Sequence, residues 1–257
     1  MKKLFATLFA MVCIGSISWL LFSGSVSHRE KVSWEEPTAP TPAPAETFRS
    51  PEPAPALPAR EVEIVTTIFD DVPFTVQAPR GKWSSPYADA CEEASILMVA
   101  SFLRQSELTP EIADKEVRSL ADFSEGKFGQ SIDASAKDTA AILEEYYGIP
   151  SNVVYDMSLE DMRRAVVDGN LLIVPANGRK LGNPNFTLPG PVNHMLVVTG
   201  YDAETKEFVT NDPGTRRGEG YRYDEDVLYG AVRDYPTGNH LPNPTERKAM
   251  IVVKVRP

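Results

Sequence analysis

The hydrophobic positions of this chain divide it into three parts. Residues 4–22 form an apolar run of 19 residues without a charge, directly after two lysines. Residues 34–60 show no hydrophobic period, and proline and alanine dominate them. From residue 61 onward, apolar positions recur with the periods that are typical of helices and strands. We therefore expect an N-terminal membrane anchor or signal segment over 1–33, a linker over 34–60 and one folded domain over 61–257.

Within the domain, helical patterns come first and strand patterns come later, which is typical of an α+β fold. Ser158 with Asp161 three positions later predicts a capped helix start, and Gly148 predicts a helix end. The predicted helices cover residues 90–104, 109–123, 135–148 and 158–169. The predicted strands cover residues 61–67, 170–176, 194–202, 206–214 and 248–257.

The apolar run at the N-terminus allows two interpretations. Its length nearly meets the roughly 20 residues that cross a bilayer, which favours an uncleaved anchor. The small residues of "SGSVS" at 23–27 also allow cleavage as a secretory signal. In both cases Lys2 and Lys3 predict that the start of the chain stays in the cytoplasm and that the domain is exported. The Pro-rich linker predicts an extended spacer between the two.

Charge and cysteine content restrict the function. The chain has a formal charge of −10, and its first 60 residues hold six Lys/Arg and five Asp/Glu, so the domain carries −11. Such an acidic domain is a poor candidate for binding nucleic acid, because the phosphates would repel it. Cys91 is the only cysteine in the domain, which excludes an internal disulfide and a multi-cysteine zinc site. No group of His, Cys and carboxylate residues has the spacing of metal ligands, so no metal is expected, and no cofactor is expected either.

The stretch "PYADACEEASILMVASFL" at 86–103 carries the first candidate for chemistry. We expect Asp89 to cap the helix, with Glu92 completing a capping box. Cys91 then lies in the first turn, where the helix dipole stabilises a thiolate and lowers the thiol pKa below about 8.5. Glu92 and Glu93 oppose this effect, so a protonated histidine is needed nearby. The structural alternative is an inert core cysteine.

Three further positions offer the partners that a reactive cysteine needs. His194 begins a predicted strand beside a loop rich in Pro, Gly and Asn, whereas His240 lies in a polar loop and is expected to face solvent. Asn211 or Asp212, on the next strand, can accept a hydrogen bond from the imidazole. Neighbouring strand residues point to opposite faces, so only one of the two can serve. Gln77 is a candidate amide donor for an oxyanion.

The order of these groups resembles the papain-like cysteine peptidases, and more closely the C-39-like peptidases, which are relatives of the bacteriocin-leader-processing proteases. The stretches that carry the resemblance are "VPFTVQAP", "ACEEASILM", "GPVNHMLVVTGYD" and "FVTNDPGTR", within residues 72–216. It implies an α+β papain-like fold in which a buried helix with the cysteine packs on an antiparallel sheet with the histidine and the aspartate. It also implies a nucleophile, a general base, an orienting acid and an oxyanion donor, which are Cys91, His194, Asp212 and Gln77. The chain has "CEE" where the family more often has "CGP".

The leading interpretation is an exported, membrane-tethered cysteine peptidase that acts on a peptide or protein substrate. Two alternatives stay open. One is a peptidoglycan amidase or endopeptidase with the same triad, and the other is a non-catalytic peptide-binding domain on the same fold. The intact Cys, His and Asp set favours an enzyme, whereas the two glutamates after Cys91 favour a binding domain. The substrate and the oligomeric state are not predicted.

Overall fold

The computed structural model describes residues 64–238, 240–241, 243 and 246–255. The apolar run and the Pro- and Ala-rich linker lie outside these residues, so the anchor and the spacer remain predictions. Among the helices of the described residues, none is both long enough and apolar enough to span a bilayer.

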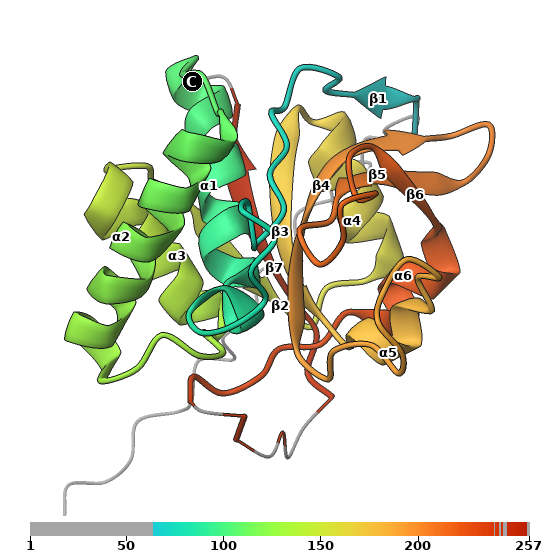
Figure 1. Cartoon of the computed structure of the whole chain (residues 1–257). Helices are drawn as coiled ribbons and strands as arrows, with labels where there is room; N and C mark the ends of the chain where they lie inside the picture. The colour runs from blue at the N-terminus through green and yellow to red at the C-terminus, as the bar shows by residue number, and fades with distance from the viewer. Residues whose placement is uncertain (1–63, 239, 242, 244–245, 256–257) are drawn as a thin grey trace, which may run out of the picture. The chain divides into compact units, whose positions relative to one another are not determined.

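An antiparallel sheet forms the centre of the domain (Figure 1). Its strands follow the order β2-β7-β3-β4-β5-β6, and β1 pairs with the end of β4. The strands are β1 (Thr67–Ile68), β2 (Asn152–Tyr155), β3 (Asn170–Ala176), β4 (His194–Asp202), β5 (Glu207–Asn211), β6 (Tyr221–Asp224) and β7 (Ala249–Lys254). Because β4 and β5 are antiparallel, the first half of β4 lies beside the end of β5: Val197 pairs with Asn211.

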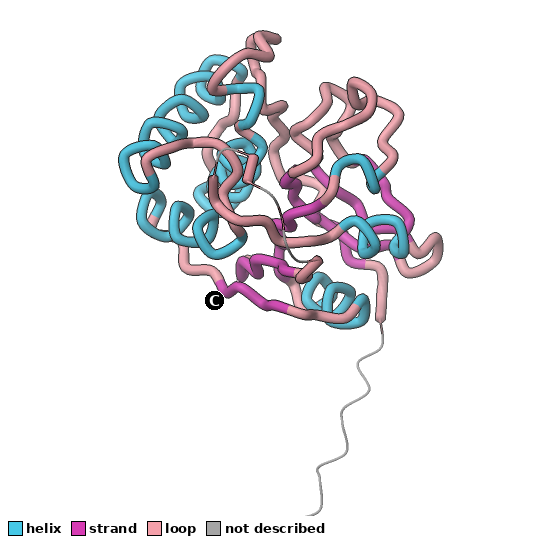
Figure 2. The backbone as a smooth tube through the Cα atoms, turned by 90° about the horizontal axis from the view of Figure 1, so that it is seen from below, coloured by secondary structure: helices cyan, strands magenta, loops and turns pink. Residues whose placement is uncertain are grey.

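Helices cover both faces of this sheet, and Figure 2 shows the strands between two groups of helices. One group contains α1 (Cys91–Arg104), α2 (Pro110–Phe128) and α3 (Ala136–Tyr147). The other contains α4 (Leu159–Val167), α5 (Gly178–Leu181) and α6 (Glu225–Ala231). A short 3-10 helix, η1 (Tyr87–Asp89), precedes α1 directly.

The central strands are buried on both sides, which explains their continuous apolar sequences. Along β3, Leu171 and Ile173 pack against α1–α3, whereas Leu172 and Val174 pack against α4–α6. The two faces alternate because successive strand side chains point in opposite directions. The strands that carry candidate site residues are therefore held rigidly from both sides.

The predicted α+β class is confirmed, and the longer elements lie where the sequence places them. The helix end at Gly148 and the capping box of Ser158 with Asp161 are both present. Of the strand predicted over 61–67, residues 61–63 lie outside the described residues; residues 64–66 are not in a strand, and β1 starts only at Thr67. The short elements β2, β6, α5 and α6 were not predicted, because four to seven residues show too little periodicity to identify them.

Candidate active site

Cys91 is the first residue of α1, and the helix is buried from Cys91 to Ser101. The residue that caps this helix is Ala90, which makes no side-chain capping hydrogen bond. Asp89 instead ends the 3-10 helix η1. The predicted capping box is therefore wrong, because the turn before α1 keeps Asp89 out of the extended conformation that a capping side chain needs. As in every α-helix, the first N–H groups of α1 have no intrahelical acceptor.

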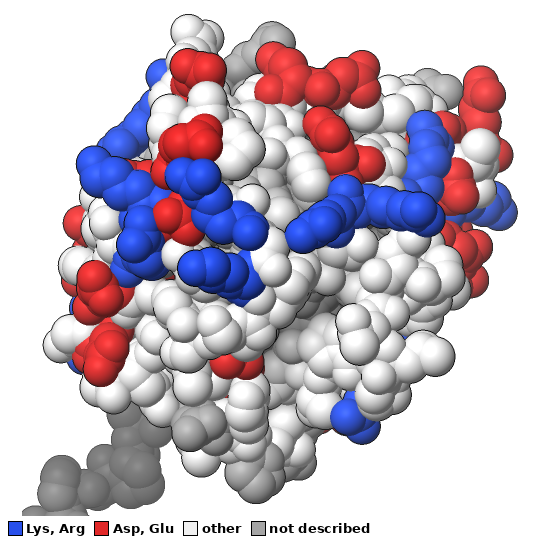
Figure 3. Space-filling view, viewed as in Figure 1, with Lys and Arg blue, Asp and Glu red and all other residues white. Residues whose placement is uncertain are grey.

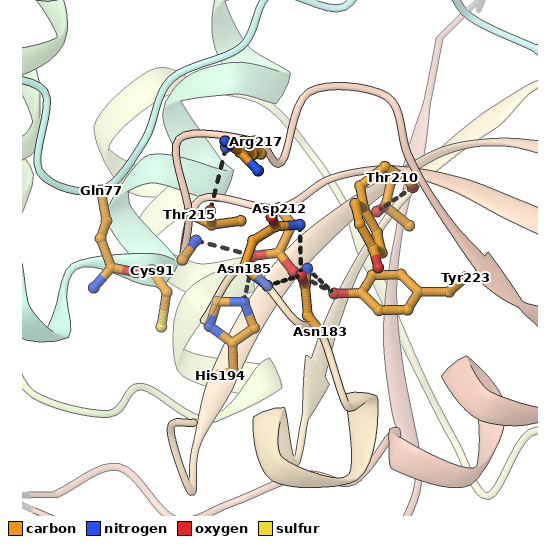
Figure 4. Close-up of polar contacts among 12 residues, drawn as sticks. Gln77, Cys91, Asn183, Asn185, His194, Thr210, Asp212, Thr215, Arg217 and Tyr223 are labelled. Carbon is orange, nitrogen blue, oxygen red and sulfur yellow. Dashed lines mark hydrogen bonds and ion pairs between the residues drawn. The ribbon is translucent and has the colours of Figure 1, made fainter. Parts of the chain in front are cut away.

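His194 and Asp212 form a buried pair at the adjoining ends of two neighbouring strands. His194 is the first residue of β4, and Asp212 follows β5 directly. The imidazole Nε2 lies 2.8 Å from the carboxylate Oδ1, and the two side chains are 1% and 0% exposed. Figure 4 shows the Cys91 sulfur beside the imidazole ring, on the side away from Asp212. The ring nitrogen that Asp212 does not engage, Nδ1, is therefore the one available to the thiol.

Asp212 is held in place by further hydrogen bonds. The Tyr223 hydroxyl donates to Oδ2 at 2.7 Å, and the Gly214 N–H donates to Oδ1 at 2.9 Å. The Asn183 amide in turn donates to the Tyr223 hydroxyl at 2.8 Å. Burial alone would raise the pKa of Asp212, but the charge of His194 and these hydrogen bonds outweigh it and lower the pKa. The carboxylate therefore stays ionised and fixes the orientation of the ring.

Asn211, the alternative partner for the imidazole, faces elsewhere. Its Nδ2 donates to the carbonyl oxygen of Val72 at 3.1 Å. Its Oδ1 accepts from the Gly220 N–H at 3.1 Å. Both ends of the amide are thus used to join loops, and the structure brings Asp212 to His194 instead.

Gln77 lines the same cleft as Cys91 and His194 and is 5% exposed. Its side-chain Nε2 donates to the carbonyl oxygens of Tyr87 and Ala88, at 3.0 and 2.8 Å. These bonds tie the segment around Gln77 to the turn just before Cys91. Since both amide hydrogens are engaged, donation to an oxyanion requires one of these bonds to be released.

These residues share a cleft of about 1030 Å³, whose lining includes Gln77, Cys91 and His194. Two carboxylates also line it, those of Asp89 and Asp133. Four guanidinium groups complete the charged lining: Arg179, Arg216, Arg217 and Arg233. A peptide in this cleft therefore meets groups of both signs. Figure 3 shows a band of Lys and Arg side chains across one face of the domain. The net negative charge of the domain is therefore not evenly spread over its surface.

His240 lies closer to the site than its sequence indicates. Its side chain is 61% exposed, as expected, but its Nδ1 lies 3.0 Å from Oδ2 of Asp133, and both residues line the cleft. The sequence does not reveal this contact, because 107 positions separate the two residues.

Among the described residues, no group of three or more His, Cys, Asp or Glu side chains could hold a metal ion.

The thiol of Cys91 is bonded to the next side chain along the helix. Its Sγ donates to Oε2 of Glu92 at 3.1 Å. Burial, followed by the negative charge of Glu92, raises the thiol pKa well above its ordinary value. The predicted lowering of this pKa is therefore wrong for the resting site, because burial and the neighbouring carboxyl groups raise it.

One comparison with known proteins identifies the family of the chain. The model of the Peptidase_C39 like family matches residues 69–235, which include all four candidate residues. Among solved structures, one described as a C39-like peptidase from Bacillus anthracis covers 74% of this chain and 98% of its own. Its TM-score is 0.41 and its sequence identity 16%, so the family model alone carries the relationship. No curated protein matches the chain.

Proposed function

Because the chain belongs to the Peptidase_C39 like family, we propose that Cys91, His194 and Asp212 hydrolyse peptide bonds by a thiol mechanism. Membership makes the protein a cysteine-type peptidase and implies a peptide substrate. The observation that carries the assignment of roles is the 2.8 Å contact of His194 with Asp212 in the cleft that contains Cys91. A nucleophile, a base and a group that orients the base are the three parts that such catalysis requires.

In the first step, Sγ of Cys91 attacks the carbonyl carbon of the scissile bond, and the thiol proton passes to Nδ1 of His194. Asp212 stabilises the imidazolium that forms, because its carboxylate stays ionised at the other ring nitrogen. The backbone N–H of Cys91, at the helix start, supports the oxyanion, and Gln77 supplies a second donor once one of its backbone bonds is released.

The second step releases the product. His194 donates its proton to the leaving amine, which leaves a thioester between Cys91 and the acyl part of the substrate. Water then attacks this thioester with His194 as general base, and the free thiol is restored. No step needs a metal or an organic cofactor.

An exported, membrane-tethered location is the finer part of this proposal. The charged start, the apolar run over 4–22 and the Pro-rich linker over 34–60 support it. The test of the catalytic proposal is a comparison of peptide hydrolysis by the full-length protein and by Cys91→Ala. Loss of hydrolysis in the variant supports the thiol mechanism, and retained hydrolysis refutes it.

A further inference from the structure

Two carboxyl groups are buried directly behind the nucleophile. Glu92 and Glu93 are 1% and 2% exposed. Of the ion pairs formed by the described residues, none involves either side chain. A buried carboxyl without a cation destabilises a fold, and such groups are concentrated at functional sites. The position of Glu92 next to Cys91 therefore calls for a specific explanation.

Glu92 is held by two hydrogen bonds to one of its oxygens. The Tyr235 hydroxyl donates to Oε1 at 2.7 Å, and the Ala134 N–H donates to the same atom at 3.1 Å. These donors come from segments that lie far apart in the sequence, and both are buried. They leave Oε2 free to face Cys91, whose Sγ donates to it at 3.1 Å.

The titratable groups around this contact are acidic apart from two histidines, His194 beside the sulfur (Figure 4) and His240, which pairs with Asp133. Cys91 and Glu93 lie on α1 itself, Asp133 comes from the loop between α2 and α3, and Tyr235 comes from the segment after α6. Burial, and then mainly Glu92, raises the thiol pKa, and burial also raises the pKa of Glu92. A thiolate would therefore lie among acidic groups, and the imidazole of His194 is the basic group that Figure 4 shows beside it.

We propose that Glu92 is a positioning residue that keeps Cys91 as a neutral thiol in the resting enzyme, so that the thiolate forms only during attack on bound substrate. During that attack the hydrogen bond to Glu92 breaks, the proton moves from Sγ to Nδ1 of His194, and the S–C bond forms while the π electrons of the carbonyl move onto its oxygen. The proposal deepens the proposed function and rests on Cys91 as its nucleophile. The alternative state of the resting enzyme is a preformed ion pair between the Cys91 thiolate and the His194 imidazolium.

The test is the rate at which iodoacetamide alkylates Cys91 in the full-length protein, measured against pH without substrate. Mass spectrometry of the peptide that contains Cys91 excludes any contribution from Cys13. In the wild type, the rate is expected to rise with a midpoint above the ordinary thiol pKa of about 8.5. This measurement on the wild type does not depend on whether any variant folds.

Glu92→Gln keeps an oxygen for Tyr235 and Ala134 but removes the charge beside the sulfur. The midpoint is then expected to fall. Each unit of fall gives tenfold more thiolate at pH 7, and the lower nucleophilicity of a more acidic thiol reduces this to about a threefold faster rate. Glu93→Gln is the matched control: the residue lies on the same turn, but its carboxyl bonds Ser124 and not the thiol. Its midpoint should change much less.

Two results would overturn the proposal: wild-type alkylation that already reaches its plateau below pH 7, or a midpoint in Glu92→Gln equal to that of the wild type. A wild-type midpoint above 8.5 together with a selective fall in Glu92→Gln would support it. If no peptide is hydrolysed, the proposed function fails, but the alkylation profile still reports the state of Cys91. The two failures are therefore distinguishable.

Discussion

Asn211 and Asp212 are adjacent in the chain, but their side chains point in opposite directions at the end of β5. The Asp212 carboxylate accepts from His194 at 2.8 Å in the cleft, whereas the Asn211 amide joins the backbone at Val72 to the backbone at Gly220. The alternation of strand side chains enforces this division. Asp212 thus binds the imidazole, and Asn211 joins the loops next to the site.

Substitution at these two positions should separate catalysis from stability. Asp212→Ala is expected to lower kcat by about 10²–10⁴, because the imidazole loses the group that fixes its tautomer and stabilises its charge. Asn211→Ala is expected to lower the melting temperature, because it leaves buried backbone groups unpaired, while kcat changes only a few-fold. Steady-state kinetics and thermal denaturation of both variants provide the measurement. A larger loss of kcat in Asn211→Ala would show that the roles are reversed.

Gln77 offers a second test of the site. If its amide supports the oxyanion, Gln77→Ala should lower kcat by about 10²–10³ and leave KM nearly unchanged. Tyr87→Phe is a control in the same turn, since it removes the hydrogen bond from the Tyr87 hydroxyl to Asp114 but leaves the backbone carbonyl that Gln77 engages. Gln77 has only a structural role if the two variants lose similar stability and both keep wild-type kcat.

Glu93 predicts a pH dependence of stability. Burial, and then the charge of Glu92, raises its pKa well above 4.5, and its Oε2 has no hydrogen-bond partner among the described residues. The folded state thus holds a proton that the unfolded chain releases near pH 4.5. Stability therefore falls as the pH rises from that value toward the folded pKa. Glu93→Gln removes this effect.

The quantity to compare is the melting temperature of Glu93→Gln minus that of the wild type. This difference should be larger at pH 8 than at pH 5. Each kcal/mol corresponds to roughly 2–4 °C in a domain of this size. Glu144→Gln, at an exposed position of α3, is the control and should show the same difference at both pH values. An equal difference at the two pH values for Glu93→Gln would contradict the raised pKa.

The location of the domain can be tested in cells. Protease added to intact cells or spheroplasts should cut the linker over 34–60 and release a fragment that begins near residue 61, because the linker is predicted to be extended and exported. Immunoblotting of the supernatant detects the fragment. Protection of the domain until the cytoplasm is opened would show that the predicted topology is wrong.

The sequence predicted those parts of the fold that depend on local pattern. The buried strands β3 and β4 are long apolar runs, and α3 and α4 carry their own caps at Ser135 and Ser158, so periodicity and end signals locate them. The helix start at Cys91 followed from the apolar run behind it. The predicted cap at Asp89 was wrong, because the sequence does not show that a 3-10 turn occupies that position.

What the sequence could not predict depends on long-range contacts. Tyr223, which bonds Asp212, lies in a four-residue strand without a local signal. Tyr235 lies 143 positions from Glu92 but bonds its carboxyl. The thiol pKa was predicted from the helix dipole, with Glu92 and Glu93 opposing it, and burial reverses the predicted direction, which only the packed domain reveals. Side-chain chemistry at a buried site thus needs the tertiary structure.

The most direct test of the central claim is a comparison of the peptide termini generated by the full-length protein and by its Cys91→Ala variant. Both are incubated with the same peptide library, and mass spectrometry identifies every new N-terminus. Cys91→Ala is expected to fold, because the change removes only a sulfur atom at a helix end. The mechanism predicts new termini with the wild type and none with the variant. The same set of termini from both proteins would contradict it.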